Sequence, residues 1–204
     1  MSSLTDCFHI NTLGTMRVTR AFLPFLRRSR GSRLVFVTSI EDRVEPLNQP
    51  IYAASKFAIR AFANACRREL RCQGVHVAVV APAFYATELA RKEELMSLLQ
   101  RNWSDTSAEV RTAYGEDHYK LFVDFTDALY AIIHKDLTGV VDAMADAVVR
   151  SCQPKYHRRI CNPLEAVALW VADLLPEELM DILSFNPLMI ALLRTVGVIR
   201  NAFS

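Results

Sequence analysis

Glycine is scarce in this sequence, with only 6 residues among 204. An average protein contains about 7% glycine, so this chain has less than half of the usual share. Glycine-rich turns let the backbone approach the phosphates of a nucleotide, and dinucleotide-binding folds place such a turn near their start. The 204 residues contain no G-x-x-x-G-x-G turn, so we expect no complete phosphate-binding site within them.

The chain also lacks an excess of one charge, paired cysteines and a long apolar run. Its 24 basic and 22 acidic residues give a net charge of +2, too little to favour nucleic acid as a partner. The 5 cysteines form no C-x-x-C pair, so their spacing indicates neither a zinc site nor a disulfide framework, and we expect no bound metal. The most membrane-like stretch, residues 182–193, has about 12 residues against the ~20 that a spanning helix needs.

Helical and strand patterns alternate along the first 82 residues. Apolar spacing predicts helices over residues 12–29 and 51–71, and β-branched apolar runs predict strands over 33–40 and 75–81. This order, with short links, predicts parallel strands joined by crossover helices, which is an α/β fold. Beyond these elements the patterns predict helices over 88–100, 107–134 and 138–151, a short strand at 158–162, and helices near 163–174, 177–184 and 187–200.

Three side chains of complementary chemistry stand at the expected edge of this sheet. Ser39 ends the first strand, while Tyr52 and Lys56 lie four residues apart at the start of the next helix and therefore share one helix face. A free phenol has a pKa near ~10, and a nearby ammonium is expected to lower it. Tyr52 would then exchange a proton with an alcohol or carbonyl oxygen that Ser39 holds, and a nicotinamide must carry the hydride because no side chain donates one. The alternative is a surface tyrosine and lysine on an amphipathic helix.

These motifs resemble the short-chain dehydrogenase/reductase family. Ser39 in VFVTSI, and Tyr52 with Lys56 in YAASK, are similar to the family's catalytic serine, tyrosine and lysine. Asn11 in INTLGT resembles the helix asparagine that holds a water in the family's proton relay. The resemblance implies an oxidoreductase with these four catalytic residues and a Rossmann-type parallel sheet, of which this chain would hold the C-terminal half.

The cofactor contacts of the family are matched only in part. Pro82 in APAFYAT resembles the family's Pro-Gly motif, with Ala83 in the place of the glycine, and Thr87 resembles the threonine that contacts the nicotinamide carboxamide. The resemblance implies NAD or NADP as the cofactor, bound by Tyr52, Lys56, Pro82, Ala83 and Thr87. The family's first strands, phosphate-binding turn and acidic ribose contact have no counterpart, so we expect an N-terminally truncated chain whose binding of free cofactor is weak or undetectable.

The segments LPFLRRSRGSRLVFVTS, AYGED and LPEELMD are similar to the branch of the family that contains retinol and hydroxysteroid dehydrogenases. This similarity implies oxidation of a lipid-like alcohol, a retinoid or a steroid, or reduction of the corresponding ketone. Phe84, Tyr85 and Trp103 would contact that substrate, with ordinary core packing as the alternative. We expect one domain over 1–204, with a catalytic part at 1–90, substrate-loop helices at 84–151, and a C-terminal strand and helices at 152–204.

The same resemblance implies partners and a location. Residues 12–29 and 53–71 resemble the family's dimer helices, so we expect a homodimer or a heterodimer. The alternative function is a catalytically inactive paralogue that only pairs with related subunits. The first ten residues show no signal peptide, which predicts an intracellular protein. The apolar tail 187–199 is typical either of core or dimer packing or of a helix on the surface of the endoplasmic reticulum or mitochondrial membrane.

Overall fold

The computed structural model describes residues 4–45, 49–88, 91–149, 157–160, 163–172, 174–176 and 178–179. Contacts divide the chain into two compact units. The sheet unit comprises Ser2–Ala83 and Leu137–Leu174, and the helical unit comprises Met1, Phe84–Asp136 and Leu175–Ser204. The sequence predicts one domain over residues 1–204; we describe the two units separately. The helices expected at 177–184 and 187–200 lie outside the described residues, apart from 178–179.

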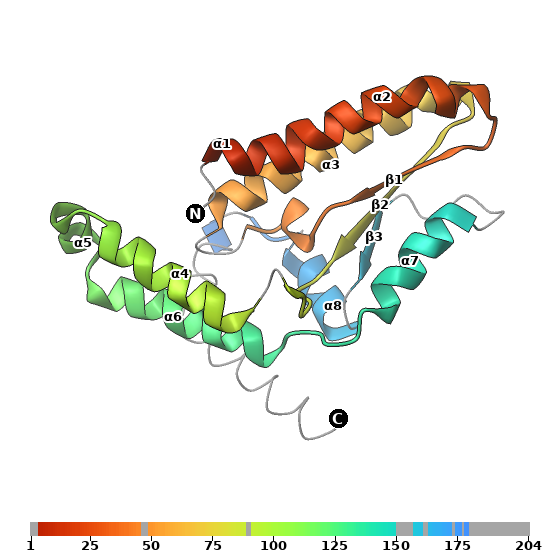
Figure 1. Ribbon diagram of the computed structural model, residues 1–204. Helices are drawn as coiled ribbons and strands as arrows, with labels where there is room; N and C mark the ends of the chain where they lie inside the picture. The colour runs from red at the N-terminus through yellow and green to blue at the C-terminus, as the bar shows by residue number, and fades with distance from the viewer. Residues whose placement is uncertain are drawn as a thin grey trace. The chain divides into compact units, whose positions relative to one another are not determined.

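Three parallel strands form the sheet of the sheet unit, in the order β1-β2-β3 (Figure 1). They span Arg33–Val37 (β1), His76–Pro82 (β2) and His157–Ile160 (β3). Phe36 of β1 stands opposite Val79 of β2. The expected parallel pairing is therefore confirmed, and β3 lies where the sequence predicts a further short strand. The central strand β2 is buried from Val77 to Ala81, because it has neighbours on both sides.

Helices cover both faces of this sheet. Those of the sheet unit are α1 (Leu4–Cys7), a π-helical segment (Phe8–Gly14), α2 (Thr15–Arg28), α3 (Pro50–Leu70), α7 (Thr138–Val149) and α8 (Pro163–Ala172). Figure 1 shows α2 and α3 side by side on one face and α7 on the other. The first helical stretch starts at Leu4, earlier than the predicted residue 12. Within the described part of the chain, no helix combines the length and hydrophobicity needed to cross a membrane.

The sequence of α3 explains its limits and its buried face. Pro50 stands in the first turn, where its missing N–H is not needed. Gly74, with a φ of 73°, ends the 3-10 turn Arg71–Gln73 that follows the helix. Buried residues recur at helical spacing and join Phe36 and Val79 in the core: Ile59, Ala63, Cys66 and Leu70. Packing of this face on the sheet fixes the position of the residues at the start of α3.

β1 is shorter than the predicted strand 33–40. It ends at Val37, and Ile40–Asp42 forms a 3-10 turn instead. Ser39 caps this turn, because its Oγ accepts a hydrogen bond from the N–H of Glu41 at 3.2 Å. The turn packs on α3, so the polar residues that follow β1 come close to the first turns of that helix.

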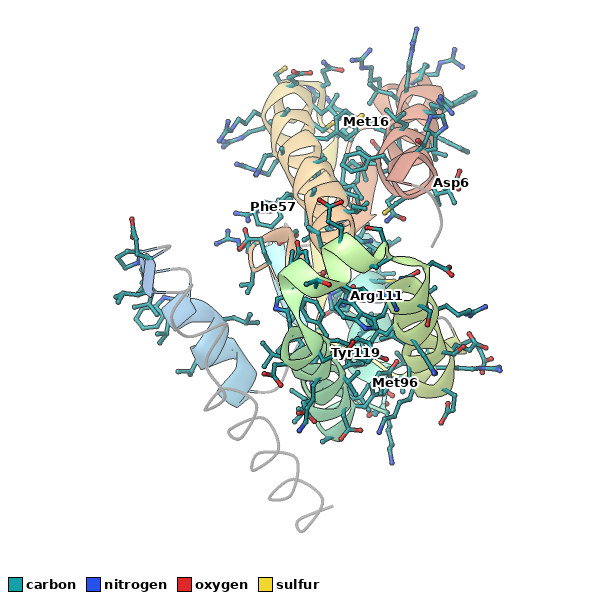
Figure 2. The ribbon with its side chains drawn as sticks, turned by 90° about the vertical axis from the view of Figure 1, so that its left-hand side faces the viewer. Asp6, Met16, Phe57, Met96, Arg111 and Tyr119 are labelled. Carbon is teal, nitrogen blue, oxygen red and sulfur yellow. The ribbon has the colours of Figure 1, made fainter. Side chains whose placement is uncertain are left out.

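The helical unit contains α4 (Lys92–Asp105), α5 (Ala108–Tyr114) and α6 (Glu116–Ala131). The predicted single helix over 107–134 is wrong, because Gly115 breaks it with a φ of 81°, a conformation outside the helical region. An ion pair between Lys92 and Asp127 joins α4 to α6. Figure 2 shows Tyr119 of α6 and Met96 of α4 among the side chains of this unit.

Candidate active site

The structure brings Ser39, Tyr52 and Lys56 together. Ser39 follows β1 and is buried, and Tyr52 and Lys56 lie on the first two turns of α3. The side chains of Ser39 and Tyr52 are hydrogen-bonded, and Nζ of Lys56 lies 5.2 Å from the centroid of the Tyr52 ring. A hydroxyl, a phenol and an ammonium thus share one space at the carboxyl end of a parallel strand, where α/β sheets bind their ligands.

The pKa of Tyr52 differs from the prediction. Burial of the phenol and the negative charge of Glu41 raise its pKa from 10.0 to about 12, although the hydrogen bond with Ser39 lowers it. Burial also lowers the pKa of Lys56, although the negative charge of Glu41 raises it. This differs from the expectation that the pKa of Tyr52 lies below its ordinary value, because burial of the phenol and the charge of Glu41 outweigh the hydrogen bond with Ser39.

Glu41 is a functional candidate that the sequence analysis missed. Burial raises the pKa of its carboxyl group from 4.5 to about 8, although the positive charge of Lys56 lowers it. Its Oε2 atom is buried and has no hydrogen-bond partner among the described residues. The sequence signal is an acidic residue two positions after the strand-end serine, within a stretch whose charges indicate only a loop.

Asn11 is bound to the helix that carries Tyr52. Its amide Nδ2 donates a hydrogen bond to Oγ of Ser55 at 3.1 Å, and that hydroxyl donates to the carbonyl oxygen of Tyr52 at 2.7 Å. Thr12 donates to the carbonyl oxygen of Ser55 at 3.2 Å. Ser55 is completely buried, so the π-helical segment and α3 are joined through it. Sequence reasoning missed Ser55; its only signal is a polar residue on the inner face of an alanine-rich helix.

A buried carboxyl group anchors the turn after β1. Asp42 is completely buried, and its Oδ2 accepts a hydrogen bond from Oγ1 of Thr38 at 2.6 Å. Arg60 of α3 donates to the carbonyl oxygen of Asp42 at 2.8 Å. The first bond closes the turn between Thr38 and Asp42, and the second fixes the turn to α3. The turn therefore positions Ser39 and Glu41 beside α3.

Replacing Thr38 by valine is expected to destabilise the sheet unit. The substitution keeps the shape of the side chain but removes one donor from the buried Asp42 carboxyl group, and hydrogen bonds to charged groups contribute about 1.5–3 kcal/mol. Urea unfolding should show a loss of that size in the free energy of unfolding. Thr38→Ser, which keeps the hydroxyl, is the control, and equal losses in both variants would contradict the role of this bond.

The residues expected to contact a cofactor are divided between the two units. Pro82 ends β2 and Ala83 follows it in the sheet unit, where both are half-buried. Thr87 belongs to the helical unit and is exposed. Tyr52 and Lys56 lie on α3 as described. Their roles in cofactor binding stay predictions.

The expected substrate residues each have an aromatic neighbour within the helical unit. Phe84 contacts Tyr130 edge to face, with ring centroids 5.2 Å apart. Tyr85 stacks on His134 at 4.9 Å. Trp103 stacks on Tyr119 at 5.1 Å. Such pairs are typical of internal packing as well as of an aromatic ligand site, so substrate contact stays a prediction for all three.

The polar groups of the sheet unit fit one end of a nicotinamide cofactor. The Lys56 ammonium and the Ser39 and Tyr52 hydroxyls offer donors suited to a ribose and to a reacting oxygen at the end of β1. The phosphates have no such match, because the sequence contains no glycine-rich turn. The residues present therefore fit the nicotinamide end of NAD or NADP and not its phosphate end.

Comparison with known proteins identifies the family. Residues 1–97 match the family described as short chain dehydrogenase. Over 146 residues, 72% of the chain, the sequence is 37% identical to retinol dehydrogenase 16 of Mus musculus. The chain belongs to the short-chain dehydrogenase/reductase family. Over 175 residues, 85% of its length, this short-chain dehydrogenase/reductase is 30% identical to the 3beta-hydroxysteroid dehydrogenase dhs-16 of Caenorhabditis elegans, which supports the retinol and hydroxysteroid branch.

The matches also show how much of each relative the chain covers. The chain spans less than half of these curated relatives, 45% of the mouse protein and 44% of the nematode protein. Two solved short-chain dehydrogenases, each 19% identical, share its fold. One from Streptomyces avermitilis has a TM-score of 0.62, over 89% of this chain and 59% of that one. One from Burkholderia cenocepacia, in complex with NADP, has a TM-score of 0.57, over 88% and 58%. The predicted partial α/β Rossmann-type fold is confirmed.

Proposed function

We propose that this chain provides the catalytic residues of an NAD(P)-dependent oxidoreductase for lipid-like alcohols, with a retinoid or a steroid as substrate. The observation that carries the proposal is the convergence of Ser39, Tyr52 and Lys56 at the end of β1. Retinol and hydroxysteroid dehydrogenases among the relatives support the substrate class. Solved relatives in complex with NADP or NAD support the cofactor.

Each of the three residues has a distinct role in this proposal. Ser39 donates a hydrogen bond to the reacting oxygen of the substrate, and a bound nicotinamide supplies or takes the hydride. In ketone reduction Tyr52 donates its proton to the carbonyl oxygen, and its pKa of about 12 keeps the phenol protonated for this step at neutral pH. In alcohol oxidation the Tyr52 oxygen accepts the proton, and Lys56 stabilises the phenolate that this requires.

Turnover by the purified chain tests this function. With retinol or a 3beta-hydroxysteroid in detergent micelles, we expect reduced nicotinamide to form, with saturation only above about 1 mM cofactor, the upper end of the usual KM range. Cofactor binding should be this weak because the glycine-rich turn is missing. Ethanol, a small alcohol, serves as the control substrate. A folded chain that oxidises no lipid-like alcohol at any cofactor concentration contradicts the catalytic proposal, and saturation at micromolar cofactor contradicts weak binding.

We also propose a homodimer or heterodimer through α2 and α3, and a peripheral location on the endoplasmic reticulum or mitochondrial membrane. Phe25 of α2 is 63% exposed, and exposed aromatic surface is typical of protein interfaces. This surface also supports the second candidate function, an inactive subunit that pairs with relatives. The apolar tail 187–199 lies outside the described residues, so the membrane proposal rests on its sequence.

A further inference from the structure

The charges of this chain are distributed unevenly, although their sum is close to zero. Residues 2–83 contain 12 basic and 5 acidic residues, whereas residues 84–136 of the helical unit contain 6 basic and 10 acidic residues. Between residues 15 and 33, which include α2, all six charged residues are arginine. Like charges in one region repel one another, so a ligand of opposite charge would stabilise such a region.

The C-terminal ends of α2 and α3 lie together in the sheet unit. The N–H of Gly31 donates a hydrogen bond to the carbonyl oxygen of Gly74, and the N–H of His76 donates to that of Ser32, both at 2.8 Å. The side chain of Arg30 lies over the turn after α3, because its Cγ is 3.3 Å from the position that a Cβ atom would take at Gly74. Figure 1 shows the two helices running side by side.

Five exposed arginines lie at this junction, and we call them the basic end: Arg27, Arg28, Arg30, Arg68 and Arg71. Within the described part of the chain, no ion pair joins the basic end to a carboxylate. Basic residues in the last turn of a helix interact favourably with its dipole. That effect accounts for each helix end by itself, but not for Arg30, which lies beyond α2 in the loop.

An exposed aromatic ring adjoins the basic end. Phe25 is 63% exposed, and the guanidinium carbon of Arg28 lies 5.6 Å from the centroid of its ring. Guanidinium groups bind phosphate oxygens through paired hydrogen bonds. Aromatic rings favour the boundary between lipid headgroups and acyl chains. The two groups together therefore match the surface of a lipid membrane.

We propose that the basic end binds the phosphate groups of an anionic lipid membrane, with Phe25 at the boundary between headgroups and acyl chains. Charge complementarity supports this partner, because a leaflet with anionic lipids presents a layer of negative charge to the five guanidinium groups. The lipid-like substrate class favours a membrane over nucleic acid, and in this respect the inference rests on the proposed function. The surface is distinct from the apolar tail 187–199, whose contact with a membrane would be hydrophobic.

Binding of the purified full chain to lipid vesicles tests the proposal. We expect cosedimentation with vesicles of phosphatidylcholine and phosphatidylserine in about 0.1 M salt, and release in about 1 M salt, because the screening length falls from ~10 Å to ~3 Å. Vesicles of phosphatidylcholine alone should bind much less protein. Equal binding to both kinds of vesicle, or binding that persists in about 1 M salt, assigns the contact to apolar groups and overturns the proposal.

Two triple variants of equal charge locate the contact. The first removes three charges of the basic end: Arg27→Gln, Arg28→Gln and Arg30→Gln. It should weaken binding to the anionic vesicles by roughly 100-fold, because each basic residue near such a surface contributes about fivefold. The control removes three exposed charges of the helical unit: Arg101→Gln, Lys120→Gln and Lys135→Gln. The control should bind like the wild type, and equal losses in both variants would mean that net charge alone acts, which overturns the proposal.

Further measurements separate lipid binding from catalysis and from nucleic-acid binding. The basic end lies at the opposite end of α3 from Tyr52, so turnover in detergent micelles should be unchanged in the first variant. Circular dichroism checks that both variants are folded. A wild-type chain without turnover that still binds anionic vesicles would refute the catalytic proposal and support lipid binding. Tighter binding to double-stranded DNA than to the vesicles, lost in the first variant, assigns the basic end to nucleic acid and overturns the proposal.

Discussion

Replacing Tyr52 by phenylalanine is expected to lower the rate of retinol or hydroxysteroid oxidation by about 10²–10⁴-fold, the usual contribution of a general acid or base. In the proposed function the phenol oxygen of Tyr52 exchanges a proton with the substrate oxygen that Ser39 holds. Phenylalanine keeps the ring, and therefore its contact with the Lys56 ammonium 5.2 Å from the centroid. The initial rate at millimolar cofactor, measured for both proteins, gives the loss directly.

Tyr114→Phe is the matched control for this variant. Tyr114 lies in the helical unit and is 59% exposed, so loss of its hydroxyl should leave turnover unchanged. Tyr52→Phe also removes the hydrogen bond with Ser39, which contributes about 0.5–1.5 kcal/mol to stability. Thermal unfolding of each variant separates this structural cost from the chemical loss. Full turnover by Tyr52→Phe would rule out the proposed proton transfer.

Local sequence patterns suffice for most of the sheet unit. The predicted helix 51–71 lies one residue from the observed α3, because an alanine-rich segment bounded by Pro50 and Gly74 has both of its ends marked in the sequence. The β-branched runs of β1 and β2 likewise predict their parallel pairing. Gly115 is the counterexample. Apolar spacing continues across it, so periodicity alone hides the break between α5 and α6.

The electrostatics of the site could not be predicted in the same way. Spacing places Tyr52 and Lys56 on one helix face, and Ser39 at the end of the strand before it. The pKa of Tyr52, however, depends on how deeply the phenol is buried and on the carboxyl group of Glu41. Glu41 reaches the site only because the turn after β1 packs on α3, a contact held by Arg60 and the buried Asp42. No local pattern in the sequence encodes that contact.

We expect a second large effect on the pH dependence of stability. It arises from the carboxyl group of Glu41. Its pKa is about 8 in the folded chain and 4.5 when exposed. Between these values the folded state binds more protons than the unfolded state, so the free energy of unfolding should fall as the pH rises, with a slope of up to about 1.4 kcal/mol per pH unit. The loss from Glu41 should be complete once the pH passes about 8. Burial lowers the pKa of Lys56 from 10.5. Between its folded pKa and 10.5, Lys56 therefore makes the free energy of unfolding rise with pH, which is opposite to the effect of Glu41.

Glu41→Gln should remove this pH dependence. At pH 5 the protonated acid and the amide are close in shape and charge, so the two proteins should be similarly stable. At pH 8 the variant should be more stable, by a few kcal/mol, because it avoids burying a negative charge. Urea unfolding between pH 5 and 8 measures the difference, with Glu45→Gln, an exposed residue of the same loop, as the control. Parallel stability curves for wild type and Glu41→Gln would mean that Glu41 is solvated, and the raised pKa of Tyr52 would then need another cause.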